Sequence, residues 1–190
     1  MKRVAIFGGS FNPIHNGHLQ IARAAIREQV CDEVWMMPSP QNPLKPSAGL
    51  LDERLRLEMV KAVLDNEENI KVSDFEFQLP LPTFTYRTLK ALRKDYPNYE
   101  FSLIIGGDNW KIFNKWRNYK EILQSTTIII YSRPGADILP DELPEGAILL
   151  KGELFSVSSS EIRRRVALGM DVSADVPAQV LEMVKKFYSK

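Results

Sequence analysis

Short apolar runs alternate along the chain with longer segments in which apolar residues recur at helical spacing. Leu51, Leu55, Met59 and Val63 lie four residues apart, which is typical of one face of an α-helix. The β-branched run 126–131 is instead typical of a strand that is buried on both faces. The pattern predicts extended segments over 4–7, 33–37, 70–77, 101–105, 126–131 and 147–150, and helices over 17–29, 51–64, 85–94, 110–124 (one or two helices), 159–168 and 177–187.

This order of elements predicts an α/β fold. We expect a Rossmann-like, doubly wound and mostly parallel sheet with helices on both faces, followed by short C-terminal helices. No repeat or linker interrupts the pattern, so residues 1–190 are predicted to form a single domain. The motifs described below predict that this domain binds a nucleotide. Ligands of such sheets bind beyond the carboxyl ends of the strands. The loops to search are therefore GGSFNPIHNGH, PSPQNPLKP, GGDNW and SRPG.

Composition narrows the classes of partner and location. The chain has 25 basic and 24 acidic residues and a net charge of +1, which gives no global basic field for a nucleic acid. No apolar run approaches the ~20 residues that span a bilayer, and MKRVAIFGG at the N-terminus is interpreted as a first strand rather than a signal peptide. Cys31 is the single cysteine, which fits a reducing compartment. We expect a cytoplasmic protein with no membrane or nucleic-acid partner.

The first loop, residues 8–18, holds both histidines of the chain. A tight turn between strand and helix, with Asn16 as the helix cap, explains the glycines but not His15 and His18. Backbone N–H groups and the dipole at a helix N-terminus favour an anion, and a bound polyphosphate would favour protonated imidazoles there. Gly17 would let a phosphate approach the backbone. Both a structural turn and a phosphate site remain open on these residues alone.

A second group of anion-binding residues lies near the C-terminus in SVSSSEIRRR. Ser158, with a glutamate three residues later, forms a capping box, which alone does not account for three consecutive serines. Arg163 lies one turn after Ser159 on the same helix face. Hydroxyls, helix N–H groups and a guanidinium together make a second phosphate site. Arg164 and Arg165 are predicted to be solvated.

The two motifs resemble those of the HxGH nucleotidyltransferases. GGSFNPIHNGHL is similar to the GG[ST]F[DN]PxHxGHL form of the bacterial nicotinate mononucleotide adenylyltransferases. SVSSSEIR is similar to their ISSTxIR motif, with Val157 and Ser160 in place of isoleucine and threonine. The resemblance runs from about residue 3 to residue 166 and includes several motifs in the same order.

The middle of the chain carries the motifs that the resemblance assigns to the second substrate. TFTYRTL resembles the family's Y-T-x-x-T-L signature, which implies that the start of this helix receives the pyridine carboxylate at Thr85. Thr85 as an ordinary helix cap is the alternative. GGDNWKIFNKW resembles a G-[AT]-D pattern followed by a tryptophan, which implies ribose binding by Asp108 and ring stacking by Trp116. Trp110 competes for the stacking role, and Arg133 is implied to contact the nucleotide.

Two positions depart from the family pattern. The family's P-H-K triplet is replaced by a sequence with Leu44, so a role for an imidazole there is lost, whereas Lys45 keeps the charge. Asn12 stands where relatives often have aspartate.

The resemblance implies transfer of AMP from ATP to nicotinate mononucleotide, with deamido-NAD and pyrophosphate as products. It implies Mg²⁺ bound through the phosphates, without a protein metal site. Alternative acceptors are nicotinamide mononucleotide and phosphopantetheine, and a nucleotide sensor without turnover is the alternative outside enzymes. A homo-oligomer is compatible with the sequence. The implied residues are His15, His18, Lys45 and Arg163 for catalysis, Gly8, Gly9, Ser10, Phe11, Gly17, Gly106, Asp108, Arg133, Ser158 and Ser159 for ATP, and Thr85 and Trp116 for the mononucleotide.

Overall fold

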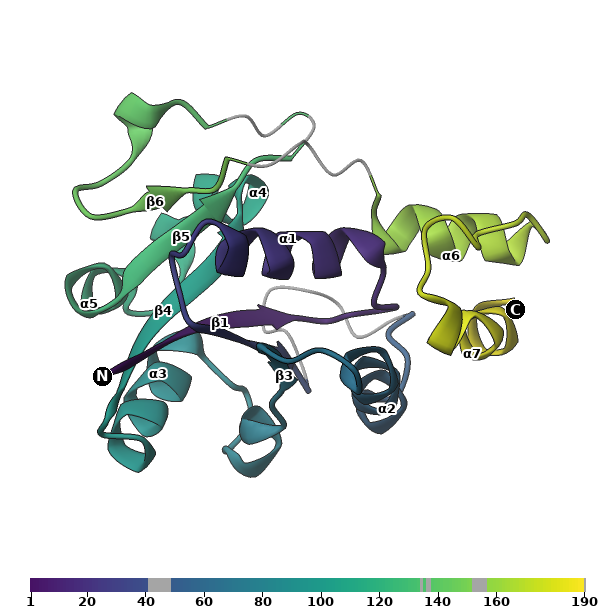
Figure 1. Cartoon of the computed structure of the whole chain (residues 1–190), viewed down its shortest axis with the longest axis horizontal. Coiled ribbons are helices and arrows are strands. Elements are labelled where there is room, and N and C mark those ends of the chain that lie inside the picture. The colour runs from purple at the N-terminus through teal and green to yellow at the C-terminus, as the bar shows by residue number, and fades with distance from the viewer. Residues whose placement is uncertain (41–48, 134, 136–137, 152–156, 190) are drawn as a thin grey trace.

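The fold is built on one parallel sheet of six strands. A computed structural model describes residues 1–40, 49–133, 135, 138–151 and 157–189 (Figure 1). The strands lie in the order β3-β2-β1-β4-β5-β6, and all neighbouring strands run parallel. Their bounds are β1 Lys2–Gly9, β2 Glu33–Pro38, β3 Ile70–Val72, β4 Tyr99–Gly106, β5 Thr127–Tyr131 and β6 Ile148–Leu149.

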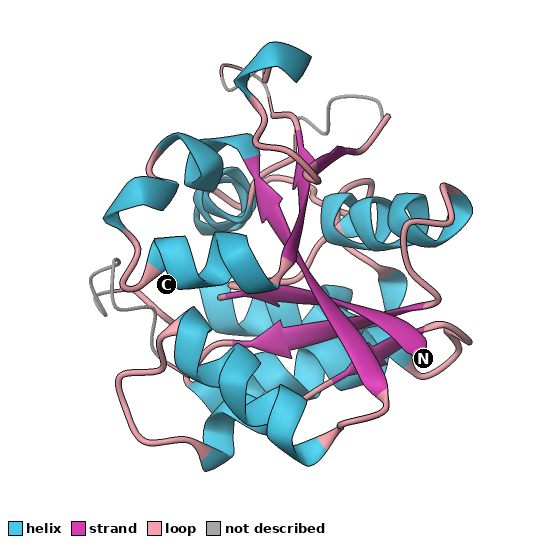
Figure 2. Ribbon diagram, turned by 90° about the vertical axis from the view of Figure 1, so that its left-hand side faces the viewer, coloured by secondary structure: helices cyan, strands magenta, loops and turns pink. Residues whose placement is uncertain are grey.

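Helices cover both faces of this sheet, as Figure 2 shows. One apolar cluster joins the sheet to α1, α2, α6 and α7, and a second joins it to α3, α5 and the turn η2. Within the described ranges, no helix is both long and apolar enough to cross a bilayer. The bounds are α1 Asn16–Arg27, α2 Glu53–Leu64, α3 Thr85–Asp95, α4 Gly107–Lys111, α5 Tyr119–Ser125, α6 Ser159–Ala167 and α7 Leu181–Tyr188, with 3₁₀ turns η1 Phe75–Gln78, η2 Phe113–Lys115, η3 Pro140–Glu142 and η4 Ala178–Val180.

The continuous apolar run in β1 follows from burial on both sides. Ala5 and Phe7 point into the first cluster, whereas Val4 and Ile6 point into the second, and all four are at most 3% exposed. Alternate residues of a strand face opposite sides of a sheet, so a strand covered on both faces needs apolar residues at every position. The predicted Rossmann-like doubly wound fold is therefore confirmed.

Several predicted boundaries were wrong for local reasons. The extended segment 70–77 ends as a strand at Val72, because β3 pairs only with the short stretch 34–36 of β2 and the chain then turns into η1. The segment 110–124, expected to be one or two helices, does form two α-helices, but α4 begins earlier, at Gly107, and η2 separates it from α5, since Ile112 leaves helical geometry and Asn118 adopts a left-handed φ of 56°. Helix α2 begins at Glu53 rather than at 51, with Asp52 as its N-cap.

The order of strands fixes where a ligand can bind. The order changes direction between β1 and β4, so the loops that follow these two strands part at that point. In Figure 1, α6 and α7 lie beyond the carboxyl end of β1, together with the C-terminus. The fold thus places the C-terminal helices against the loop that follows the first strand.

Candidate active site

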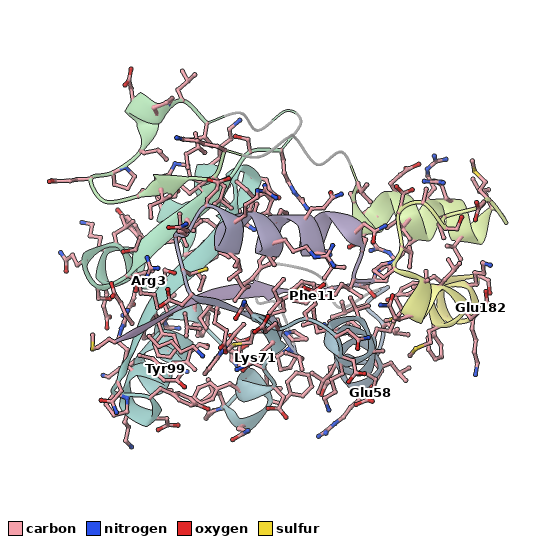
Figure 3. The ribbon with its side chains drawn as sticks, viewed as in Figure 1. Arg3, Phe11, Glu58, Lys71, Tyr99 and Glu182 are labelled. Atoms are coloured by element: carbon pink, nitrogen blue, oxygen red, sulfur yellow. The ribbon has the colours of Figure 1, made fainter. Side chains whose placement is uncertain are left out.

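A buried aromatic side chain, that of Phe11, anchors the loop after β1 in the core. Phe11 has a left-handed φ of 44°, and its ring is 2% exposed and packs edge-on against Phe7, with ring centroids 5.8 Å apart. Figure 3 labels Phe11 where β1 ends. A Cβ atom at Gly9 would lie 3.2 Å from this ring. A side chain at position 9 would therefore press against the Phe11 ring, which is itself buried.

The two histidines form a stacked pair at the start of α1. Their ring centroids lie 3.7 Å apart, and the His15 backbone N–H donates to Nδ1 of His18 at 3.2 Å. The N-cap is His15, so the prediction that Asn16 caps the helix was wrong. Asn16 is instead the first helical residue, and its backbone N–H and Nδ2 donate to the carbonyl oxygens of Asp175 (2.8 Å) and Ala174 (3.0 Å).

His15 is the more deeply buried of the pair. It is 1% exposed, and neither of its ring nitrogens has a hydrogen-bond partner among the described residues. Burial, assisted by the positive charge of Arg133, lowers the pKa of His15 to about 3. An unpaired buried ring nitrogen is costly and suits a site that a polar ligand completes. Protonation of the histidines by a bound polyphosphate stays a prediction.

The buried neutral state of His15 predicts acid-sensitive stability. The native pKa is about 3, whereas an unfolded histidine titrates near 6.5, so the unfolded state binds the extra proton as the pH falls through this window. This group alone should lower the free energy of unfolding by about 2 kcal/mol between pH 7 and pH 5. Urea denaturation of the wild type and His15→Phe over this range measures the effect. Equal pH dependence of the two proteins would contradict it.

The second motif, which is predicted to bind an anion, contacts the loop after β1 directly. Oγ of Ser159 donates to the carbonyl oxygen of Pro13 at 2.9 Å, and Nη1 of Arg163 donates to that of Asn12 at 2.6 Å. Ser158 is the N-cap of α6, because its Oγ accepts the backbone N–H three residues further on. Residues that are about 150 positions apart in the sequence are thus brought to one place.

The two arginines that follow Arg163 differ from each other. Arg164 is exposed and pairs with Glu161, as predicted for a surface residue. Arg165 is half-buried and donates to the carboxylate of Asp175 and to the carbonyl oxygen of Asp171, so the prediction of a solvated side chain was wrong there. The reason is that the segment before α7 folds back over α6 and also contacts the start of α1.

The loops at the carboxyl ends of β4 and β5 hold further predicted site residues. The Asp108 carboxylate is 53% exposed, and its Oδ2 lies 3.7 Å from Nη1 of Arg133, whose guanidinium also lies 5.7 Å from the centre of the Tyr131 ring. A Cβ atom at Gly106 would lie 2.5 Å from Oδ1 of Asp108, so a larger residue there would displace this carboxylate. Because Arg133 also acts on His15, the predicted residues of these loops share one electrostatic environment. Lys45 and Leu44 lie outside the described residues.

The start of α3 is organised by a carboxylate that sequence reasoning missed. Phe84, not Thr85, is the N-cap, and Thr85 is the first helical residue. Thr88 donates to Glu76 at 2.8 Å, and burial raises the pKa of this carboxyl group. The Arg117 guanidinium lies 5.1 Å from the centre of the Phe84 ring, which brings the segment after η2 beside the start of α3.

The two candidate stacking tryptophans have different surroundings. Trp116 is half-buried, its ring centroid lies 5.0 Å from that of Phe113, and its indole N–H is buried without a partner in the described part of the chain. Trp110 lines a cavity of about 380 Å³ together with Phe113 and Tyr119. The neighbouring Arg117 contacts Phe84 at the start of α3, and the stacking role of Trp116 stays a prediction.

Asn12 is a second residue that sequence reasoning undervalued. Its Oδ1 accepts hydrogen bonds from the Tyr188 hydroxyl (2.6 Å) and the Leu51 N–H (3.2 Å), and its Nδ2 donates to the Gly49 carbonyl oxygen (3.1 Å). The side chain therefore joins the first loop to α7 and to the segment before α2. A carboxylate at this position could accept but not donate, so the amide is the group that satisfies all three partners.

Known proteins share this fold and these motifs. Residues 6–165 match the cytidylyltransferase-like family. A relative from Bacteroides fragilis, named a probable nicotinate-nucleotide adenylyltransferase, is 41% identical over 90% of this chain and 85% of its own length. One of the same name from Bacteroides thetaiotaomicron is 39% identical over 97% and 92%.

The solved structures agree with this assignment at the level of the fold. The Plasmodium falciparum nicotinic acid mononucleotide adenylyltransferase complexed with NaAD covers 100% of this chain and 98% of its own, with a TM-score of 0.86 and 22% identity. The ordered motifs and the relatives together settle the family. The chain belongs to the cytidylyltransferase-like family and, within it, to the nicotinate-nucleotide adenylyltransferases.

Proposed function

We propose that the protein transfers AMP from ATP to nicotinate mononucleotide, forming deamido-NAD and pyrophosphate. Relatives that are 39–41% identical over nearly the whole chain carry this activity in their names. The observation that carries the proposal is the joining of the two anion-binding motifs, in which Ser159 and Arg163 bond to the loop that holds both histidines. A structural turn would have no need of this second motif.

The reaction is an in-line displacement at phosphorus. A phosphate oxygen of the mononucleotide forms a new bond to the α-phosphorus of ATP, while the bond from that phosphorus to the bridging oxygen breaks. Pyrophosphate leaves with the electron pair of the broken bond. No side chain becomes covalently attached, so the protein contributes by holding the two substrates in line and by stabilising the charge that develops on the phosphates.

The residues of the site divide this work by position. His15 and His18 lie at the start of α1, where they can donate to the α-phosphate. Arg163, with Ser158 and Ser159 at the start of α6, is placed to hold the β- and γ-phosphates, and Lys45 adds charge to the same group. The backbone of Gly8, Gly9, Ser10, Phe11 and Gly17 lines the phosphate path, and Gly106, Asp108 and Arg133 face the nucleoside.

Mg²⁺ fits this site as an ion that enters with the nucleotide. In the described residues, no three His, Cys, Asp or Glu side chains are grouped closely enough to hold a metal ion. Mg²⁺ commonly keeps several waters and binds through substrate phosphates rather than through a protein cage. When bound, the ion neutralises phosphate charge.

The pyridine end of the mononucleotide would lie between α3 and η2. The free N–H groups at the start of α3, at Thr85, suit a carboxylate. Trp116 follows η2 and offers an aromatic face to a ring that carries positive charge.

Loss of the indole should weaken binding of the mononucleotide. We expect Trp116→Ala to raise the Kd for nicotinate mononucleotide about 10-fold, the size of a stacking or cation–π contact. Calorimetry measures this directly, with Trp116→Phe as the variant that keeps an aromatic ring against Phe113. An unchanged Kd in Trp116→Ala, or an equal loss in Trp110→Ala, would remove the stacking role from Trp116.

The proposed activity also implies the partners of the protein and its cellular location. ATP and nicotinate mononucleotide are the proposed partners, with no nucleic acid or membrane. A single cysteine, which is buried, and near-neutral charge fit a cytoplasmic enzyme. A homo-oligomer is compatible with the fold.

Pyrophosphate release tests the proposed activity. The purified protein should be assayed with ATP and Mg²⁺ against nicotinate mononucleotide, nicotinamide mononucleotide and 4′-phosphopantetheine in parallel. We expect a strong preference for the first acceptor. Preference for another acceptor would overturn the assignment of the pyridine site, and no turnover with any of them would favour a nucleotide sensor.

A further inference from the structure

Arg56 is a fully buried charged residue that the mechanism above does not use. It is 0% exposed and, among the residues that the structure describes, makes four hydrogen bonds, all to backbone carbonyl oxygens. Nε donates to Leu51 (2.8 Å), Nη1 to Ser10 (2.6 Å) and Ser39 (2.9 Å), and Nη2 to Pro40 (3.1 Å). No carboxylate in the described residues lies within 4.0 Å of it.

These carbonyl groups belong to the loops at the carboxyl ends of two adjacent strands. Ser10 lies in the loop after β1, which leads to the histidine pair, and Ser39 and Pro40 follow β2 directly. Ser39 also donates its backbone N–H to the carbonyl oxygen of Gly9, the last residue of β1, at 2.9 Å, so the ends of the two strands are joined beside the carbonyl groups that Arg56 binds. One side chain therefore fixes the spacing of both loops and ties them to the start of α2.

The geometry also orients a backbone donor. In a trans peptide, the N–H points opposite to the carbonyl of the preceding residue. The Ser10 carbonyl points at Arg56, so the N–H of Phe11 points away from the guanidinium. A left-handed residue such as Phe11 is held in place only when its surroundings determine it, and this hydrogen bond is part of those surroundings.

The positive charge of Arg56 also favours binding of an anion by these loops. The buried cation is stabilised by direct hydrogen bonds to carbonyl dipoles, and the carboxylates of Asp52 and Glu53 favour it only from beyond ion-pair distance. An anion bound above the loops would complete the compensation. Removal of the guanidinium would leave four carbonyl oxygens converging on a space without a donor.

We propose that Arg56 is a positioning residue for the polyphosphate site, in which its guanidinium holds the backbone of Ser10, after β1, and of residues 39–40, after β2, in the arrangement that binds ATP. It touches no substrate. The inference rests on the proposed function because that function names ATP as the anion.

The test compares the buried Arg56 with a half-buried arginine in the intact protein. Arg56→Lys keeps the charge but cannot reach four carbonyl groups. The matched control is Arg93→Lys, because Arg93 is half-buried and donates to the Ser125 carbonyl oxygen (2.7 Å) near the amino ends of the strands, far from the site. We expect calorimetry with Mg·ATP alone to show a Kd at least about 10-fold higher for Arg56→Lys and within about 2-fold of wild type for Arg93→Lys.

Turnover separates positioning from general destabilisation. In Arg56→Lys, KM for ATP should rise more than KM for the mononucleotide, and both proteins are to be assayed well below their melting temperatures. Wild-type ATP affinity in Arg56→Lys, or an equal loss in Arg93→Lys, would overturn the proposal. Because ATP binding is measured without an acceptor, failure of the adenylyl-transfer function would appear separately, as a wild-type protein that binds ATP and releases no pyrophosphate.

Hydrogen exchange in the wild type decides the matter if Arg56→Lys does not fold. ATP should slow amide exchange in the first turns of α2, around residues 53–57, because Arg56 couples this helix to the loops. Exchange around residues 123–127, near Arg93, should not change. Unchanged exchange in α2 on ATP binding would contradict the coupling.

Discussion

Substitution of His18 by alanine is expected to lower kcat for pyrophosphate release by about 10²- to 10³-fold, the usual effect of removing one donor aimed at developing charge. Nδ1 of His18 accepts the His15 backbone N–H at 3.2 Å, so the neutral ring carries its proton on Nε2. We propose that this proton is donated to the α-phosphate as charge gathers there. KM for ATP should change much less than kcat, because the mechanism proposed above assigns ATP binding to several other groups.

A structural role for His18 makes a different prediction. His18 also supplies the acceptor that completes the start of α1, and His18→Asn keeps an acceptor within reach of the same N–H. Recovery of kcat in His18→Asn would mean that helix capping is its main contribution, which would contradict the catalytic role. Gln20→Ala, an exposed change on the same helix, should leave both kcat and the melting temperature close to wild type.

The architecture could be predicted because it depends on local patterns. Apolar runs such as 4–7 and 126–131 are unambiguous when a strand is buried on both faces, and alternation with helices then forces parallel crossovers. The ends of the strands and helices were harder to predict because they depend on contacts with other segments. β3 ends where β2 stops pairing with it, and the break at Asn118 is a left-handed residue that no periodicity marks.

The candidate site could be predicted where a ligand constrains the sequence directly. Both sequence motifs, the loop after β1 and the serines before Arg163, lie at the starts of helices as the sequence predicted. The fold brings the two motifs into contact. Errors arose where another segment supplies the partner. Asn16 and Arg165 both bond to residues 171–175, a contact that neither local sequence indicates.

The position of Arg56 on its helix is a sequence signal for a special role of this residue. It lies on the buried side of α2, one turn before Met59 and Val60, which are both fully buried. A charged residue on an apolar helix face is an inconsistency between local pattern and packing, and such inconsistencies concentrate at functional sites. Glu76, buried beside Thr83 and Thr88, had no such signal because it lies in a 3₁₀ turn that the pattern missed.

Arg163→Ala should reduce kcat/KM for ATP by about 10²-fold, because the guanidinium joins α6 to the loop after β1 and, in the mechanism proposed above, contacts the phosphates that leave. Its Nη1 donates to the Asn12 carbonyl oxygen at 2.6 Å and its Nη2 to Ser160 Oγ at 3.3 Å. Lysine retains the charge but not the planar pair of donors. Arg163→Lys should therefore recover only part of the loss, and steady-state kinetics with ATP as the varied substrate measures both variants.

Arg164→Ala is the matched control for this experiment. Arg164 is the next residue on the same helix and is exposed, and its ion pair with Glu161 is of a kind that contributes little to stability. Its removal changes the net charge by the same amount as Arg163→Ala and should leave kcat/KM within about 2-fold of wild type. An equal loss in both variants would mean that the overall charge near α6 attracts the nucleotide. A loss confined to Arg163 would instead require the specific position that its bond to Asn12 fixes.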